Sequence, residues 1–164
     1  MATVEQTLGT PTSTRPAESL AARNITSGYK GTPVIRDVSL SVGAGEVVLV
    51  VGPNGAGKST LVKTINGELP LMSGSVVLDG EDISALAEER RASRGIGYVP
   101  QVRDVFPTLT VRENLEMGAY RLSPKHAEER VEAVMTQFPQ LKQFGKRHAK
   151  ALSGGQRKLV GVAR

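Results

Sequence analysis

The chain has 164 residues, of which 39% are hydrophobic and 23% are charged, a composition typical of a soluble globular protein with a substantial core. It contains no cysteine, which excludes disulfide bonds and thiolate metal sites. No apolar run approaches the roughly 20 residues of a membrane-spanning helix, and we expect no secretory signal because the first residues lack an apolar core.

The net charge of +5 is not evidence for nucleic-acid binding, because the excess is confined to the C-terminal end. Seven Lys or Arg and no acidic residue lie from Gln140 to Arg164, and the rest of the chain has a net charge of −2. Aromatic residues make up 4% of the chain, so nucleic-acid bases would find few stacking partners. We therefore expect no nucleic-acid partner.

The first half of the chain predicts a tail followed by strands around one helix. Residues 1–19 are rich in Thr, Ser, Pro and Ala without periodicity, which predicts a disordered tail. Strands are predicted, from alternation or from short apolar runs between turn residues, at 20–29, 34–42, 47–51, 74–78 and 96–99. The run 47–51 is apolar throughout, which is typical of a buried parallel strand.

A glycine-rich loop follows the apolar run 47–51. It consists of Gly52, Pro53, Asn54, Gly55, Ala56, Gly57, Lys58, Ser59 and Thr60. Its spacing is G-x-x-x-x-G-K-[ST], and a helix is predicted from Lys58 to about Gly67. The glycines can reach positive φ and let backbone N–H groups approach a phosphate, which the helix N-terminus also attracts. Lys58 is then placed to contact β- and γ-phosphates, and the Ser59 hydroxyl to coordinate Mg²⁺.

The second half of the chain is predicted to be mainly helical, after a short polar helix at 84–93. Thr110 and Glu113 form a capping box that begins a helix reaching about Tyr120. Ser123 and Pro124 begin another helix, as N-cap and first helical residue. The apolar face of this helix, which we expect to pack in a core, consists of Ala127, Val131, Val134, Met135 and Phe138.

A second motif, Leu152-Ser153-Gly154-Gly155-Gln156, begins the last predicted helix. Ser153 and Gln156 have the spacing of a capping box, which explains these two residues from local structure alone. It does not explain the glycines between them, each of which weakens a helix by roughly 1 kcal/mol. Two glycines at a helix N-terminus suit a backbone that must approach an anionic ligand closely.

The two motifs together resemble the ATP-binding-cassette ATPases, whose signature is Leu-Ser-Gly-Gly-Gln. The resemblance covers about residues 20–164 and implies an α/β fold, a P-loop NTPase core with an antiparallel β-subdomain and a helical subdomain. It implies subdomain bounds of 20–101 for the β-subdomain and core, about 102–152 for the helical subdomain, and 153–164 for the signature helix. The segments Tyr98–Gln101 and Val105–Leu115 look like those of ATP-binding subunits of branched-chain amino-acid, urea and amide importers.

The resemblance also implies roles for single residues. Gln101 matches the Q-loop glutamine, which contacts Mg²⁺ or its bound water, and Tyr29 matches an aromatic residue that stacks on adenine. In this family two ATP-binding domains pair head to tail. The residues that would complete the ATP site of the partner domain are Leu152, Ser153, Gly154, Gly155 and Gln156. Strand-end solvation for Gln101, and a plain edge position for Tyr29, are the alternatives without a ligand.

The implied ligands are ATP and Mg²⁺, with Ser59 and Gln101 as the metal contacts. The implied partners are a second ATP-binding subunit, membrane permease subunits and, indirectly, a substrate-binding protein. The implied location is peripheral, on the cytoplasmic face of the cell membrane. The implied activity is ATP hydrolysis that energises uptake of branched-chain amino acids or a related small polar solute. Alternatives are a family member acting in translation or DNA repair, and a nucleotide-binding protein that does not hydrolyse ATP.

No catalytic residue can be identified in this sequence. The family continues into an apolar strand that ends in Asp-Glu, followed by a histidine, and this chain ends at Arg164 before such a strand. We therefore expect a C-terminally truncated chain with hydrolysis near background. The apolar run that ends at Asp79 imitates that strand, but it precedes Gln101 and enters a tight turn, so we reject it.

Overall fold

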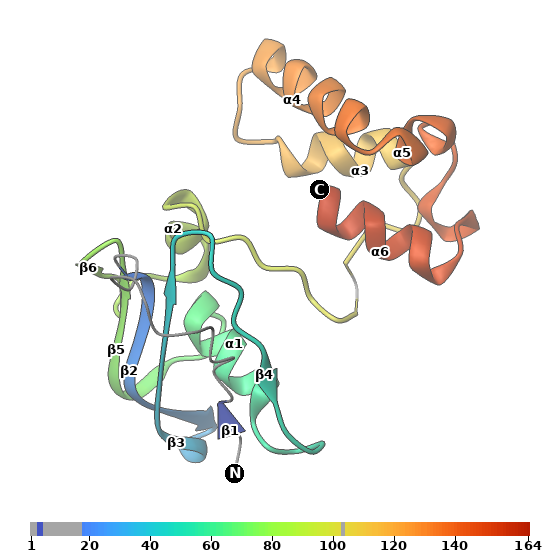
Figure 1. The fold of residues 1–164 in the computed structure, drawn as a ribbon. Helices are drawn as coiled ribbons and strands as arrows, with labels where there is room; N and C mark the ends of the chain where they lie inside the picture. Colours follow the sequence, from blue (N-terminus) through green and yellow to red (C-terminus); the bar gives the residue numbers. More distant parts are fainter. Residues whose placement is uncertain (1–2, 5–17, 103) are drawn as a thin grey trace, which may run out of the picture. The chain divides into compact units, whose positions relative to one another are not determined.

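The computed structural model describes residues 3–4, 18–102 and 104–164 (Figure 1). The chain divides into two compact units, Met1–Gly97 and Tyr98–Arg164, which are described separately. Most of the predicted disordered tail, residues 1–2 and 5–17, lies outside the described residues. Within that stretch, Thr3–Val4 form strand β1, and Glu18 begins strand β2.

The first unit is built on a four-stranded antiparallel sheet in the order β3-β2-β5-β6 (Figure 1). The strands are β2 (Glu18–Tyr29), β3 (Thr32–Gly43), β5 (Leu71–Leu78) and β6 (Glu81–Asp82). The predicted strands 20–29, 34–42 and 74–78 are thus confirmed. The turn between β5 and β6 has positive φ at Asp79 (48°) and Gly80 (83°), so Asp79 lies in a hairpin turn and does not end a parallel strand.

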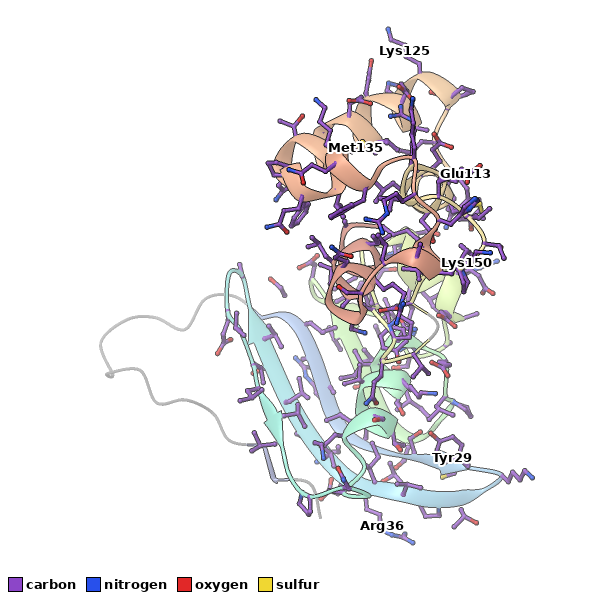
Figure 2. The ribbon with its side chains drawn as sticks, turned by 90° about the vertical axis from the view of Figure 1, so that its right-hand side faces the viewer. Tyr29, Arg36, Glu113, Lys125, Met135 and Lys150 are labelled. Atoms are coloured by element: carbon purple, nitrogen blue, oxygen red, sulfur yellow. The ribbon has the colours of Figure 1, made fainter. Side chains whose placement is uncertain are left out.

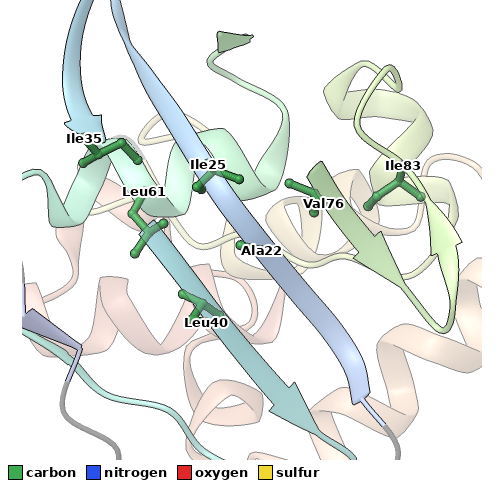
Figure 3. Close-up of a cluster of buried hydrophobic side chains, with 7 residues drawn as sticks. All are labelled: Ala22, Ile25, Ile35, Leu40, Leu61, Val76 and Ile83. Atoms are coloured by element: carbon green, nitrogen blue, oxygen red, sulfur yellow. The ribbon is translucent and has the colours of Figure 1, made fainter. Parts of the chain in front are cut away.

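Helix α1 (Lys58–Asn66) contributes to the hydrophobic core of this sheet. Figure 3 shows the core side chains, which come from β2, β3, α1, β5 and the residue after β6: Ala22, Ile25, Ile35, Leu40, Leu61, Val76 and Ile83. Val38 and Val42 of β3 pack against this cluster, which also contains Leu40. Burial of each large aliphatic side chain stabilises the unit by roughly 1.5–3 kcal/mol.

The predicted buried strand 47–51 is wrong in both extent and burial. Strand β4 contains only Val50–Val51, and it pairs antiparallel with β1. Val47 is 90% exposed and Leu49 is 65% exposed. An apolar run becomes a buried strand only when strands pair on both sides of it, and among the described residues only β1 pairs with β4. The predicted strand 96–99 is wrong for the same reason, since these residues have no strand partner.

The predicted polar helix at 84–93 is shorter in the structure, where α2 covers Glu88–Ser93. Its Arg91 is only 2% exposed and donates hydrogen bonds to backbone carbonyls at the end of α1 and before α2. Helix α1 ends, as predicted, at Gly67, which has a φ of 89°.

The second unit is helical and contains α3 (Val111–Gly118), α4 (Pro124–Gln137), α5 (Pro139–Phe144), the 3₁₀ helix η1 (Ala149–Ala151) and α6 (Gly154–Ala163). The predicted N-caps Thr110, Ser123 and Ser153 are confirmed, each accepting a backbone N–H of its own first turn. Helix α4 buries Val131 and Met135 of its predicted apolar face. The sequence did not predict α5 or η1.

A buried asparagine shapes the approach to α3. The Asn114 side chain accepts from the N–H of Phe106 at 2.7 Å, and donates to the carbonyls of Phe106 at 3.0 Å and Thr110 at 2.8 Å. Arg112 forms ion pairs with Glu116 in its own helix and with Glu128 and Glu132 in α4. These contacts fix α3 against α4 and set the course of the segment between residues 104 and 110.

None of the helices among the described residues is long and apolar enough to cross a membrane.

Candidate functional site

The loop of residues 52–60 has a backbone that only glycine adopts readily at three positions. The φ angles are 151° at Gly52, 84° at Gly55 and 92° at Gly57, as the sequence predicted. At Gly57 a Cβ atom would also lie 2.4 Å from Cγ2 of Ile35, so the start of α1 is pressed against the core. The glycine at 57 is therefore required both by conformation and by space.

The N-terminus of α1 has no side-chain cap. Its N-cap residue is Gly57, and no side chain of the described residues accepts a hydrogen bond there. The helices α3, α4 and α6 are capped by Thr110, Ser123 and Ser153, and the six-residue helices α2 and α5 have no side-chain cap either. The first backbone N–H groups of a helix need an acceptor, and together with the helix dipole they attract anions. The first N–H groups of α1 can therefore donate hydrogen bonds to an external anion.

The ammonium group of Lys58 is held on the loop. Its Nζ atom donates to the carbonyl oxygens of Gly52 and Pro53, both at 2.7 Å. A lysine ammonium has three protons, so one remains for a further acceptor. The loop therefore carries a fixed positive charge beside the open N–H groups of α1, an arrangement that can neutralise a phosphate group.

The two hydroxyl residues after Lys58 have different environments. Ser59 is exposed, so its hydroxyl is accessible to a ligand, and Thr60 is buried. Behind them, the Thr64 hydroxyl can donate to Ser27 Oγ at 2.8 Å or to the Thr60 carbonyl at 2.7 Å, and the Ser27 hydroxyl donates to the Pro70 carbonyl at 2.9 Å. These buried hydroxyls attach α1 to β2 and keep the loop in place.

Tyr29 belongs to the same unit as the loop and lies at the end of β2, next to the hairpin turn (Figure 2). Its side chain is 47% exposed. The turn residues Lys30 and Gly31 have φ angles of 50° and 81°, which is the conformation of a tight hairpin turn. A half-exposed ring at a rigid turn is available to stack on a planar ligand.

The other predicted site residues belong to the second unit. Gln101 is exposed and does not end a strand, and its carbonyl oxygen accepts from Lys158 Nζ at 3.3 Å. In the signature motif, the Ser153 N–H donates to Gln156 Oε1 at 2.9 Å and the Gln156 N–H donates to Ser153 Oγ at 3.3 Å, so the predicted capping box is present. Leu152 is buried in the core of this unit.

The two signature glycines have no packing reason within this chain. A Cβ atom at Gly154 or Gly155 would meet none of the described residues within 4 Å, and neither glycine has a positive φ. Both are exposed at the start of α6. The backbone of both glycines is therefore open at the start of α6.

Lys158 was missed in the sequence, where it is one of several basic residues near the C-terminus. It joins the segment of Gln101 to the helix of the signature motif, through the Pro100 carbonyl at 2.8 Å and Asp104 Oδ2 at 3.1 Å. The contact with Pro100 spans 58 residues of sequence, so no local pattern reveals it. Among the described residues, no group of three or more His, Cys, Asp or Glu could hold a metal ion.

Comparisons with known proteins agree with these observations. The ABC transporter family matches residues 35–164. A probable branched-chain amino acid transport ATP-binding protein, LivF of Archaeoglobus fulgidus, is 41% identical over 85% of this chain and 59% of its own length. The lipopolysaccharide export system ATP-binding protein LptB of Escherichia coli K12 is 40% identical over 89% of this chain and 61% of its own length.

Among solved structures, a nucleotide-free ATP-binding cassette from an ABC transporter superposes with a TM-score of 0.77 at 34% identity. The match covers 90% of this chain and 64% of that structure. The chain thus spans about three fifths of the length of these relatives, and it has the ABC ATPase fold that the sequence predicted. The chain belongs to the ABC transporter family, within its ATP-binding domain.

Proposed function

We propose that the loop of residues 52–60 binds the phosphates of ATP, and that the whole protein is the ATP-hydrolysing subunit of a transport system. The observation that carries this proposal is the uncapped N-terminus of α1 behind a glycine loop that holds the Lys58 ammonium. The first N–H groups of α1 have no side-chain acceptor, and together with the Lys58 ammonium beside them they suit an external anion.

The residues of the loop fit a nucleotide with Mg²⁺. Lys58 would contact the β- and γ-phosphates with its remaining proton, and the exposed Ser59 hydroxyl would ligate the metal. Magnesium in such sites is held mainly by phosphate oxygens and water, with few protein ligands. When bound, the metal neutralises phosphate charge, and Gln101 is the further residue that would contact it or its water.

Tyr29 would stack on the adenine ring. Its half-exposed side chain at the end of β2 supports this role, since an aromatic ring that stacks on a base must be accessible. Stacking of this kind is worth about 1–3 kcal/mol per base.

The β-subdomain and core would cover about residues 20–101, the helical subdomain about 102–152 and the signature helix 153–164.

The signature residues would act on a second ATP-binding subunit. Gly154 and Gly155 leave an open backbone beside the α6 N-terminus, which supports contact with the phosphates of a nucleotide held by a partner. Leu152 would anchor the motif in the core, while Ser153 and Gln156 shape its first turn. ATP would join two such subunits, and its hydrolysis would release them. The pair would then change between two states according to the bound ligand.

The transport system would lie on the cytoplasmic face of the membrane, with permease subunits and a substrate-binding protein as partners. The similarity to LivF supports a proposed role in the uptake of branched-chain amino acids or a related small polar solute. The similarity to LptB, at nearly the same identity, supports lipopolysaccharide export as a second candidate function. Membrane proteins that co-purify with the protein distinguish the two, because an amino-acid permease supports the first and a lipopolysaccharide exporter the second. Ribosomes or DNA in the same purification would instead favour a family member that does not transport.

ATP binding can be tested on this chain, and hydrolysis on the whole protein, because we assign no catalytic base among residues 1–164. We expect the chain alone to hydrolyse ATP near background. Equilibrium binding of ATP with Mg²⁺ should weaken in Lys58→Ala by about tenfold or more, the loss typical of a charge-assisted contact. Lys63→Ala is the matched control, since Lys63 is on the same helix and pairs with Glu68 away from the loop. Equal binding by both variants would contradict the proposal.

A further inference from the structure

Lys158, in the second turn of α6, is bound to the segment that contains Gln101. Its Nζ atom lies 2.8 Å from the Pro100 carbonyl oxygen, 3.3 Å from the Gln101 carbonyl oxygen and 3.1 Å from Asp104 Oδ2. All of these residues belong to the second unit. Lys158 therefore donates two hydrogen bonds to backbone carbonyls and forms an ion pair with the Asp104 carboxylate.

The segment is also fitted to α6 by shape. At Gly161 a Cβ atom would lie 2.9 Å from Cβ and 3.1 Å from Cγ of Asp104, so only glycine allows this approach without displacement. Asp104 is only 13% exposed on its side chain, which makes its ion pair with Lys158 stronger than a fully exposed one. Val105, the next residue, is buried in one cluster with Val160 of α6.

No helix or strand holds the backbone of residues 96–102. Gln101, within this stretch, is exposed. A residue that must contact a bound metal or its water is effective only when its backbone is held in one place, since ordering it later costs conformational entropy. The contacts of Lys158 are placed on the carbonyl of Gln101 itself and on that of its neighbour.

We propose that Lys158 is a positioning residue that fixes the backbone of Gln101 to helix α6. The signature motif and the segment of Gln101 then move as one body, so that a ligand contact at the start of α6 is transmitted to Gln101. Lys158 lies two residues beyond Gln156 on a single helix, which makes this link short and rigid. The functional part of this inference depends on the proposed role of Gln101 in ATP hydrolysis.

The link can be measured on the 164-residue chain by NMR relaxation of backbone amides. In Lys158→Met, the order parameters of Gln101 and Val102 should fall from about 0.85 toward 0.6, and those of α3 and α4 should not change. Lys158→Arg keeps the charge and the donors, so it should restore most of the order. Lys125→Met removes an exposed lysine from α4 and is the matched control. Unchanged order at Gln101 in Lys158→Met would overturn the proposal.

A second measurement separates positioning from mere stability. In the assembled ATPase, Lys158→Met should lower kcat by about tenfold with little change in KM for ATP, because the loop of residues 52–60 is untouched. Partial recovery is expected in Lys158→Arg. If the order parameters of Gln101 fall in Lys158→Met but kcat does not, the positioning role is refuted. If the unsubstituted protein hydrolyses no ATP, the proposed function fails, while the order parameters still decide whether Lys158 holds Gln101.

Discussion

Nη1 of Arg91 donates a 2.7 Å hydrogen bond to the carbonyl oxygen of Ile65, in the last turn of helix α1. The same nitrogen donates to Thr64, and the remaining guanidinium nitrogens donate to the carbonyls of Ser84 and Leu86. The last carbonyls of a helix have no partner within it, so a buried helix end needs donors from elsewhere. Arg91 thus supports the far end of the helix whose N-terminus forms the candidate phosphate site.

We expect Arg91→Leu to lower the free energy of unfolding by about 2–4 kcal/mol, because buried carbonyl oxygens lose their donors. Burial of the guanidinium lowers the pKa of Arg91, because desolvation disfavours its charged form. Urea unfolding followed by circular dichroism measures the change. Arg90→Leu is the control, since Arg90 is the exposed neighbour on the same helix. Equal stability of the two variants would contradict the structural role of Arg91.

These two adjacent arginines show where sequence reasoning ends. Residues 84–93 predict a polar helix, and nothing in that pattern separates a buried arginine from an exposed one. The acceptors of Arg91 are backbone carbonyls, which every residue type carries, so they leave no trace in the sequence. The contacts of Lys158 with Pro100 and Gln101 were also missed. Their acceptors are backbone carbonyls too, and they are 58 and 57 residues away in sequence.

Local features were predicted well, because a few neighbouring residues determine them. The capping boxes of Thr110 and Ser153 depend on residues three positions away, and both are present in the structure. The positive φ angles in the loop of residues 52–60 follow from glycine itself. The buried strand at 47–51 failed because burial depends on paired strands elsewhere, and hydrophobicity alone does not supply them.

A pair of alanine substitutions in the loop tests the space around α1. Gly57→Ala should destabilise the chain by about 2–4 kcal/mol, because it adds a steric clash with Ile35 to the strain of a positive φ. Gly55→Ala has a similar φ but open space around its Cβ position, so it should cost about 1–2 kcal/mol. Thermal unfolding of both variants measures the difference. A larger loss in Gly55→Ala would show that the packing of the loop on Ile35 is misassigned.

The capping box of α3 should make stability depend on pH. The Glu113 carboxylate accepts hydrogen bonds from the Thr110 N–H, which has the larger effect, and from the Thr110 hydroxyl. Both bonds lower the pKa of Glu113 below its ordinary value of 4.5. A carboxylate with a lowered pKa in the folded state stabilises the protein above its unfolded pKa, and this stability is lost as the pH falls through the folded pKa. Stability should therefore decline on acidification below about pH 4.5 in part through Glu113.

Glu113→Gln keeps the geometry of a capping box and removes the charge, so it should flatten this part of the pH dependence. Thr110→Val removes the hydroxyl donor but keeps the backbone donor, so the dependence should shrink and not disappear. Urea midpoints measured from about pH 6 to about pH 3 give both results. Identical slopes in Glu113→Gln and the unsubstituted chain would exclude Glu113 as a source.

Substitution of the signature glycines should change stability and function in opposite directions. Gly154→Ala and Gly155→Ala occupy the first turn of α6 in open space, so each should stabilise the chain by up to about 1 kcal/mol through helix propensity. If the open backbone is used by the nucleotide of a partner subunit, the same substitutions should lower ATP-dependent dimerisation and hydrolysis in the whole protein. Thermal unfolding and size-exclusion chromatography with ATP measure the two effects. Variants that gain stability and still dimerise and hydrolyse ATP normally would show that the glycines do not serve a partner.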